Sequence, residues 1–582
     1  MKKIFFGLLV AGAVGMLWAE DAERSGIAVD NQIPGGNIEL VSVKGDDVHV
    51  RNEMRDTEGW WFWWSFRVRG AAGRRLTFHF DKVRGWNENV PNRGACVSLD
   101  RGGSWFYSEK EPFSPTAFTY TFPKDADEVW FSMSVPYGVR EWEDFVRRHA
   151  GDAALKVSTL CKSRHGRDVP LVRIGSAHAR HRVFLSSRHH CAETTATFVL
   201  EGLLEGALAA DETSAWLRDN VEIVAVPMMD LDGVIAGDQG KHRRPHDYNR
   251  DYTEFIWPET RAVRDLLRDG RETAAFIDFH CPHYNDPRIH LMMRRHGRNE
   301  DNQRIFASLV EKNAAGLQYF RKNDYPWGDF WNCDRLYATG NSSTLWATSL
   351  PGMRFSGCYE IPFADTRRDR TGRPGSPVTP ANARAFGRSV AKSLREFLSD
   401  PKAAPILPPA SPAGTVLFER KEVAPAGAAW PVPAELAGLE NGFAVEFTLE
   451  AGPQKPWAGV VQARFADGKG GWRLPFSFSS DDRNRLYFRM DTHLSVNEQN
   501  VVASVPVFDG QPHRIRATFE PNPDCANNTR VVGYVDGQEA FRVDRRKGRV
   551  GFSSVAENLL TVNCGRAPFA GQVRDLRVTR TR

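Results

Sequence analysis

Six residues that follow a short apolar run bring an imidazole and a carboxylate close together. The segment 188–193 comes after the apolar run 183–185 and before residues 194–208, which we expect to form a helix. His190 and Glu193 are three residues apart at the exit of the predicted strand, so their side chains lie next to each other. Catalytic zinc sites use three protein ligands, with two His and one Glu among the known sets, and leave the fourth position to water. The segment therefore predicts two of three ligands for a zinc ion.

Four further motifs follow in the chain and strengthen this interpretation. They are Asp-x-Asp-Gly at 230–233, Asp-x-Asn-Arg at 247–250, Asp-x-His at 278–280 and Cys-Tyr-Glu-Ile-Pro at 358–362. Together with His-x-x-Glu, this order resembles the zinc metallocarboxypeptidase family, the carboxypeptidase A-like peptidases. The resemblance covers about residues 150–400. It implies an enzyme with a Zn²⁺ cofactor that hydrolyses the C-terminal peptide bond of peptides or proteins.

The resemblance implies a catalytic role for four of these residues. His190, Glu193 and His280 are the implied zinc ligands, and Glu360 is the implied general base. A carboxylate beside a zinc-bound water takes a proton as the water attacks and passes it to the leaving amine. His189 competes with His190 for the ligand position, and the spacing to Glu193 favours His190.

A second group of residues is implied to bind or support the substrate. Asn249 and Arg250 match the family's pair that holds the free C-terminal carboxylate, a task that suits an arginine fork and an amide donor. Tyr337 resembles the mobile tyrosine loop of carboxypeptidase A. On the same register the pocket floor is near Thr344, a small neutral residue that leaves the preferred C-terminal side chain open. Asp278 fits a supporting role, in which it orients a ligand imidazole.

One position departs from the family pattern. The cytosolic-carboxypeptidase-like subclass carries an arginine that steadies the oxyanion, nine residues before the Asn of the Asn-Arg pair. In this chain that position is Gly240. Lys241, Arg243 and Arg244 follow at once and are the candidates to supply the charge. We include Lys241 among the expected substrate-binding residues.

Changes in composition divide the chain into domains. Residues 25–145 carry short alternating runs separated by turn residues, which predicts a β-sandwich like the one that precedes the peptidase domain in the cytosolic-carboxypeptidase-like subclass. Residues 146–402 alternate between predicted strands and helices, which predicts an α/β catalytic domain with a mixed, doubly wound sheet and helices on both faces. The Pro-rich segment 403–413 is the expected linker. Residues 414–582 resemble a laminin-G-like or concanavalin-like β jelly roll, a module that often binds glycans.

The N-terminus has the pattern of an export signal. Lys2 and Lys3 precede an apolar stretch at 4–18, and Ala19 marks the expected cleavage point. We therefore expect a signal peptide at 1–19 and a secreted or periplasmic protein. The stretch is short for a membrane span, so we expect no membrane association beyond the signal segment. Eight cysteines in an exported chain permit disulfides, but their pairing does not follow from the sequence.

Two alternatives to a carboxypeptidase remain open. A net charge of +5 over 582 residues is too balanced to indicate nucleic-acid binding. A zinc-dependent amidase or deacylase would use the same ligands on a different bond, although the Asn-Arg pair and the tyrosine loop favour peptides. A glycan-binding or surface-binding protein with a decayed peptidase domain would need neither Glu360 nor a complete ligand set, and the sequence has both.

Overall fold

The computed structural model describes most of the chain from residue 26 onward. The described residues are 26–55, 57, 62–109, 114–293, 298–329, 332–333, 340–348, 350–366, 375–406, 414–424, 427–437, 439, 442–466, 472–492, 495–522, 525–544, 551–552, 558–562 and 567–581. They divide into two compact units, one made mainly of residues up to Ala403 and the other mainly of Ala404–Arg582. The predicted signal peptide and residues 407–413 of the predicted linker lie outside the described residues.

The first unit begins with two small sheets that pack aromatic side chains against each other. One sheet has the order β1 (Ala28–Asp30), β4 (Ser65–Arg69), β9 (Glu128–Ser132), β6 (Cys96–Ser98) and β7 (Phe106–Tyr107). The other has the order β2 (Glu39–Lys44), β3 (Asp47–Arg51), β5 (Arg75–Phe80) and β8 (Ala117–Thr121). The rings of Phe66 and Phe131 in the first sheet lie 5.5 and 5.4 Å from the ring of Phe78 in the second. The predicted β-rich N-terminal part is confirmed.

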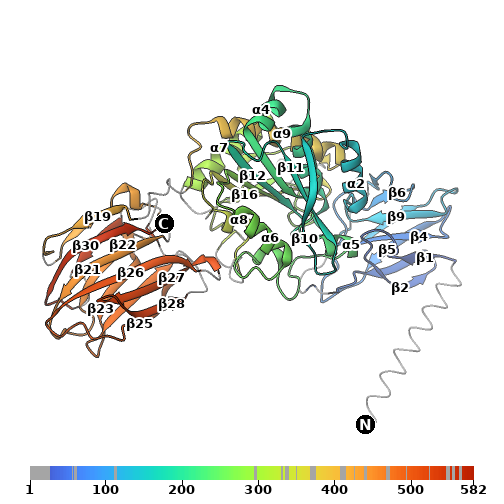
Figure 1. Cartoon of the computed structure of the whole chain (residues 1–582). Coiled ribbons are helices and arrows are strands. Elements are labelled where there is room, and N and C mark those ends of the chain that lie inside the picture. The colour runs from blue at the N-terminus through green and yellow to red at the C-terminus, as the bar shows by residue number, and fades with distance from the viewer. Residues whose placement is uncertain are drawn as a thin grey trace, which may run out of the picture. The chain divides into compact units, whose positions relative to one another are not determined.

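A seven-stranded mixed sheet forms the centre of the first unit (Figure 1). Its order is β10 (Leu155–Lys162), β11 (Asp168–Ile174), β13 (Val221–Val226), β12 (His181–Ser187), β14 (Ala275–His280), β16 (Phe355–Glu360) and β15 (His290–Met292). The four strands β13, β12, β14 and β16 run parallel, and β10, β11 and β15 pair with antiparallel neighbours.

The parallel strands explain where the motifs lie. Every residue of β12, β13, β14 and β16 is buried, as expected for strands covered on both faces. These four strands lie in the segment 146–402, where we expect strands to alternate with helices. Parallel strands end at one edge of a sheet, and ligands in α/β sheets bind at that edge. The motifs follow these ends, so the sheet gathers them in one place.

Helices and short strands connect or flank the strands of the central sheet. They are α2 (Val139–Arg148), α3 (Thr194–Leu208), α4 (Glu212–Asn220), α5 (Leu231–Ala236), η1 (Tyr248–Arg250), α6 (Pro258–Leu267), α7 (Arg298–Asn313), η2 (Arg321–Asn323), α8 (Ser343–Ala347), β17 (Asp365–Thr366), β18 (Ser376–Pro377) and α9 (Pro380–Ser399). The helix α9 has a capped N-terminus, because Thr379 accepts a hydrogen bond from the backbone N–H of Asn382 and Pro380 is the first helical residue.

Two glycines allow α3 and α9 to approach each other closely. A Cβ atom on Gly202 would lie 2.1 Å from the carbonyl oxygen of Arg384, and one on Gly387 would lie 2.1 Å from that of Val199. Both positions therefore require glycine for contact rather than for an unusual backbone conformation. The contact fixes α3, and with it the chain that leads from the zinc motif into this helix.

The second unit consists mainly of two six-stranded sheets. One has the order β19 (Val416–Arg420), β30 (Gln572–Arg580), β21 (Phe443–Glu450), β26 (Pro512–Asn522), β27 (Cys525–Val535) and β28 (Gln538–Asp544). The other has the order β20 (Ala429–Pro431), β29 (Asn558–Val562), β22 (Gly459–Ala466), β23 (Trp472–Ser480), β24 (Leu486–Thr492) and β25 (Ser495–Val502), and η4 (Ala434–Leu436) lies between β20 and β21. One apolar cluster with members from both sheets forms the core. An α/β domain flanked by β-rich parts is thus confirmed, whereas the jelly-roll topology and the domain boundaries stay predictions.

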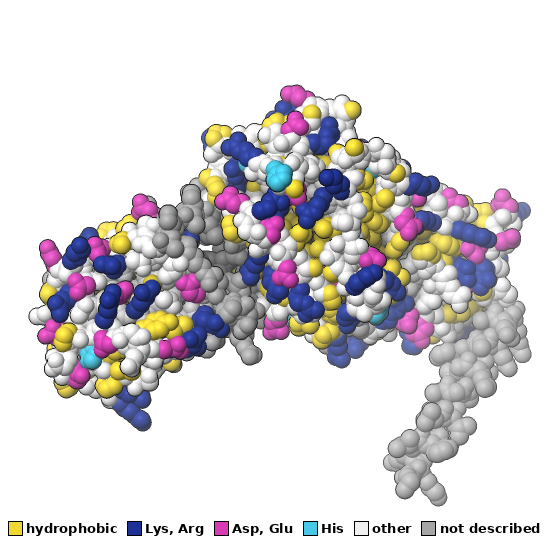
Figure 2. Space-filling model, viewed as in Figure 1, with side chains coloured by type: hydrophobic (Ala, Val, Ile, Leu, Met, Phe, Trp, Pro, Cys, Tyr) yellow, Lys and Arg dark blue, Asp and Glu magenta, His cyan; other side chains and the backbone are white. Residues whose placement is uncertain are grey.

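The remaining features of the described residues concern their cysteines, the length and polarity of their helices, and their surface charge. Six cysteines in the described part carry free thiols: Cys96, Cys161, Cys191, Cys281, Cys333 and Cys358. Among the described residues, each helix is too short or too polar to cross a bilayer. On the face drawn in Figure 2, basic and acidic side chains are interspersed, in agreement with the small net charge.

Candidate metal centre and active site

Three predicted ligands meet at the edge of the central sheet. His190 lies in the loop after β12, Glu193 precedes the first turn of α3, and His280 is the last residue of β14. The Nδ1 atom of His190 lies 2.8 Å from Glu193 Oε1, and the Nδ1 atom of His280 lies 2.7 Å from Glu193 Oε2. All three side chains are buried, and one potential ligand atom from each lies within 4.8 Å of the others. The structure therefore brings together residues that are 90 positions apart in the chain.

The donor set fits a divalent cation. Glu193 Oε2 is buried and makes no hydrogen bond with the described residues, although His280 Nδ1 is near. Burial opposes ionisation of Glu193, but the charges of His190 and His280 outweigh it and hold the pKa of Glu193 well below its ordinary value. An ionised carboxylate and two imidazole nitrogens that face it are the ligands that zinc binds.

Each ligand imidazole is held from behind by a carboxylate. His190 Nε2 lies 3.2 Å from Asp247 Oδ1, and His280 Nε2 lies 2.9 Å from Asp278 Oδ2. An N–H on Nε2 leaves Nδ1 free to face a metal, so both carboxylates select the tautomer that zinc requires. The sequence predicted this role for Asp278 and assigned none to Asp247. The signal was present, since Asp247 begins the Asp-x-Asn-Arg motif.

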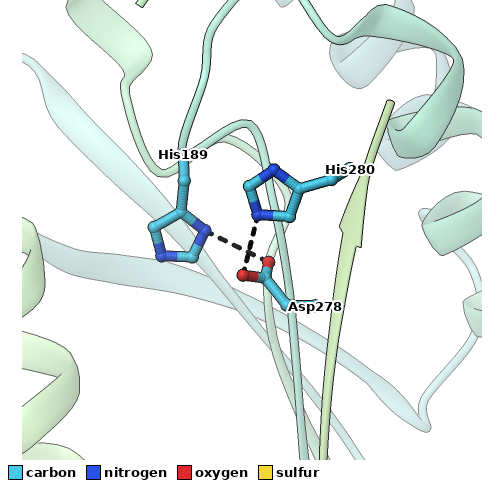
Figure 3. Close-up of side chains that lie close together, drawn as sticks. All are labelled: His189, Asp278 and His280. Carbon is cyan, nitrogen blue, oxygen red and sulfur yellow. Dashed lines mark hydrogen bonds and ion pairs between the residues drawn. The ribbon is translucent and has the colours of Figure 1, made fainter. Parts of the chain in front are cut away.

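His189 belongs to the support of the site. Figure 3 shows Asp278 between His189 and His280, with one carboxylate oxygen turned to each ring. His189 Nδ1 lies 3.1 Å from Asp278 Oδ1, and its Nε2 lies 2.8 Å from the hydroxyl of Tyr252. These three residues form a second group whose ligand atoms are close together, and both nitrogens of His189 already have partners in it. The group of His190, Glu193 and His280 therefore suits a metal better.

Glu360 is the last residue of β16 and lies beside the ligand group. The two parallel strands pair His280 with Glu360 in register, and Ile361 donates a backbone hydrogen bond of 2.7 Å to the carbonyl of His280. The side chain of Glu360 is 7% exposed. Burial raises its pKa above the ordinary value, and the charges of His280 and Lys241 oppose that rise.

The Asn-Arg pair lies in η1, next to the ligand histidine. Asn249 Nδ2 lies 3.0 Å from His280 Nε2, and Asn249 Oδ1 accepts a hydrogen bond of 2.9 Å from the backbone N–H of Ser343. Arg250 is half-buried and donates to the carbonyl of Asn249 at 2.6 Å. The charge of Arg250 also helps to lower the pKa of Asp247. Asn249 is thus close to the metal group, and Arg250 supplies a cation beside it.

The basic residues after Gly240 differ in their surroundings. Arg243 is 4% exposed, and its Nη2 lies 2.8 Å from Asp230 Oδ2 and 3.0 Å from Asp238 Oδ2. These two carboxylates neutralise Arg243 in the interior. Lys241 is half-buried, and its charge acts on Glu360. Tyr337 lies outside the described residues, and Thr344 is buried at the start of α8.

Comparison with known proteins agrees with this geometry. A model of the zinc carboxypeptidase family matches residues 141–370, and a model of the cytosolic carboxypeptidase N-terminal domain matches residues 29–133. The chain thus carries a domain of the zinc carboxypeptidase family at residues 141–370. Members of this family use Zn²⁺.

Curated relatives match part of this chain. Human cytosolic carboxypeptidase 2 is 29% identical over 229 residues, which are 35% of this chain and 25% of that protein. Its counterpart from Danio rerio is 26% identical over 266 residues, 41% of this chain and 35% of that protein. The chain thus matches about a quarter to a third of the length of these relatives.

Solved structures share the fold of a large part of this chain. A metallo-carboxypeptidase from Burkholderia cenocepacia has a TM-score of 0.55 and 20% identity, and the match covers 64% of this chain and 99% of that one. A metallo-carboxypeptidase from Pseudomonas aeruginosa, solved with (2-guanidinoethylmercapto)succinic acid, has a TM-score of 0.54 and 18% identity, with the same coverage. At such low identity the likeness establishes the fold alone.

The comparisons correct one prediction and leave another without support. The expected secreted or periplasmic location is wrong, because the curated relatives are cytosolic carboxypeptidases and the N-terminal domain is of the cytosolic type. The export prediction rested on a short apolar run behind Lys2 and Lys3, a local pattern, whereas the match spans two folded parts of the chain. Glycan binding by the C-terminal strands has no support.

Proposed function

We propose that this chain hydrolyses the C-terminal peptide bond of peptides or proteins, with His190, Glu193 and His280 holding the zinc ion. The observation that supports this proposal most is the convergence of three buried ligand atoms beside Glu360. When bound, zinc supplies Lewis-acid polarisation of the scissile carbonyl and of a water molecule. Asp247 and Asp278 hold the two imidazoles so that both Nδ1 atoms face Glu193.

Glu360 is the proposed general base. Its carboxylate takes a proton from the attacking water and then gives that proton to the nitrogen of the leaving amino acid. A buried carboxylate with a raised pKa suits this exchange, because it accepts a proton more readily than an exposed one. Lys241, whose charge acts on Glu360, is proposed to face the negative charge that develops on the substrate carbonyl oxygen.

Asn249 and Arg250 are proposed to bind the substrate's terminal carboxylate. Asn249 lies beside the ligand histidine, and Arg250 adds a half-buried guanidinium next to it. A carboxylate bound there would set the distance from the chain end to the scissile bond, which is what makes an exopeptidase. Tyr337 remains part of the proposed substrate site from its motif alone.

Two peptides that differ only at the C-terminus test this proposal. We expect the free acid to be trimmed and its amidated twin to be cleaved at least about a hundredfold more slowly, since the amide cannot form the charge-assisted pair with Arg250. The Arg250→Ala variant should reduce the difference by slowing cleavage of the acid. Arg321→Ala, which changes a surface arginine paired with Glu311, is the matched control. Equal cleavage of acid and amide by the unaltered enzyme would leave an endopeptidase or amidase.

A further inference from the structure

An apolar cavity lies within the first unit, and none of the three proposed zinc ligands lines it. It has a volume of about 360 Å³ and is lined by residues of the N-terminal sheets, of α2 and of the loops that carry the zinc motif and α5. Three indole rings contribute to its wall, those of Trp63, Trp105 and Trp130. Hydrophobic side chains gather on the face drawn in Figure 2 near the positions that Figure 1 labels α2 and α5. The cavity has the size and the lining of a small-molecule site.

One charged side chain in this wall has unused donors. Arg188 is 2% exposed and lines the cavity. Its Nε and Nη2 atoms donate to the carbonyl of Cys191, and its Nη1 donates to the carbonyl of Tyr137 at 2.7 Å. A guanidinium has five N–H groups, so two remain without an acceptor among the described residues.

Arg188 also forms no ion pair with a carboxylate among the described residues, although the charge of Glu193 acts on it from farther away. Two carboxylates contribute to the cavity wall, and both are engaged elsewhere. Glu141 accepts from the backbone of Gly138 and pairs with Arg140. Asp238 pairs with Arg55 and Arg243. Buried arginines are rarely left without a counter-charge, because removing a charge from water is costly.

The backbone of Arg188 is strained in a way that supports a special role. Its φ angle is 64°, in the left-handed region that a side chain with a Cβ atom rarely adopts. Such residues persist where the surrounding structure imposes them, and they gather at functional sites. Here the turn directs His190 toward the metal group and places the guanidinium of the same loop at the cavity wall.

We propose that this cavity binds a small organic acid with an aromatic body and a single carboxylate. The carboxylate would accept the two remaining N–H groups of Arg188 and neutralise it, and the indole rings would contact the apolar body. A volume of about 360 Å³ holds an acid of one or two rings and excludes a folded partner. The same guanidinium holds the carbonyl of Cys191, between two proposed zinc ligands, so the occupant would contact the support of the catalytic loop.

Calorimetric titration of the zinc-loaded, full-length protein tests the proposal with two probes. Indole-3-acetate carries the required charge, and indole-3-acetamide has the same shape without it. We expect the acid to bind at least about tenfold more tightly than the amide, because hydrogen bonds between two ions are the stronger ones. Equal affinities, or no binding of the acid, would overturn the proposal.

Variants distinguish the cavity from the active site, which can also accept a carboxylate. Val139→Trp and Ile235→Trp each fill the cavity from a partly exposed wall position, so at least one should fold, as judged by circular dichroism and zinc content. Each folded variant should lose acid binding at least about tenfold, whereas Val157→Trp on the exposed side of β10 should not. Acid binding should survive in Arg250→Ala. Binding that is lost in Arg250→Ala and kept in the filled variants would place the acid in the active site and refute the proposal.

Discussion

His280 and Glu360 are register partners on the neighbouring parallel strands β14 and β16. Because both are the last residues of their strands, the proposed metal ligand and the proposed base leave the sheet side by side. Their separation in sequence, 80 positions, is therefore closed by the sheet itself and not by a flexible loop. Catalytic groups held by strand ends keep their geometry when the substrate changes.

The placement of Glu360 beside the proposed ligands, and not among them, predicts that a change at Glu360 affects turnover without affecting zinc binding. Glu360→Gln keeps the shape of the side chain and removes its ability to accept a proton, so turnover should fall by about 10²–10⁴-fold. Zinc content, measured by atomic absorption, should not change. Glu205→Gln on α3 serves as the control, because that carboxylate pairs with surface arginines. Near-normal turnover in Glu360→Gln would assign the base to another residue.

The contact between His190 and Asp247 predicts an effect on metal affinity. Asp247→Ala removes the carboxylate that holds His190 Nε2, and affinity for zinc should fall by about 10–100-fold, the usual cost of losing such a partner. Asp247→Asn, which can still accept from Nε2–H, should restore part of it. Competition with a chelator measures the affinity for zinc. The double variant His190→Ala, His280→Ala serves as the reference in which the zinc site is lost. Unchanged affinity in Asp247→Ala would contradict the assigned role.

Many residues of the candidate site could be predicted from the sequence because they belong to short motifs at strand ends. The apolar run at 183–185 predicted the strand that became β12, and the motifs at the strand ends predicted the residues that the structure brings together as proposed ligands. The motif marked Asp247, but the partners of Asp247 and His189 did not follow from the sequence, since these contacts depend on segments that meet only in three dimensions. Arg243 and Lys241 look alike in sequence, yet Arg243 is paired with Asp230 and Asp238, which lie in a preceding helix turn and loop.

The predicted location was wrong for a related reason. A positive end and an apolar stretch form a pattern of fewer than twenty residues, and such a pattern carries less information than a match over two folded domains. Location therefore had to come from the comparison with cytosolic carboxypeptidases.

A buried carboxyl group predicts a pH dependence of stability. Glu259, in the first turn of α6, is fully buried, and burial raises its pKa from 4.5 to about 7. Its Oε2 accepts from the hydroxyl of Tyr248, and its Oε1 has no partner among the described residues. The fold thus favours the protonated acid, and this contribution to stability is complete below about pH 4.5 and is lost as the pH rises through about 7.

The variant Glu259→Gln should remove that dependence. The difference in unfolding free energy between the unaltered protein and the variant should shift by at most about 3 kcal/mol between pH 4.5 and pH 8, with the unaltered protein losing stability. Denaturation in urea at several pH values measures the difference. A difference that stays constant over this range would mean that Glu259 has an ordinary pKa in the fold.

The structure of the C-terminal unit predicts that this unit folds independently of the rest of the chain. Its two six-stranded sheets share one apolar core that includes Phe447, Phe478 and Phe519, all fully buried. A part of this size with its own core can fold alone. We therefore expect residues 414–582 to unfold cooperatively as an isolated fragment, as measured by thermal scans with circular dichroism.

The remaining chain should hydrolyse short peptides at rates within about twofold of the full-length enzyme, because the proposed ligands, Glu360 and Arg250 all belong to the first unit. Loss of all activity on short peptides after this truncation, with zinc still bound, would show that the C-terminal unit completes the active site.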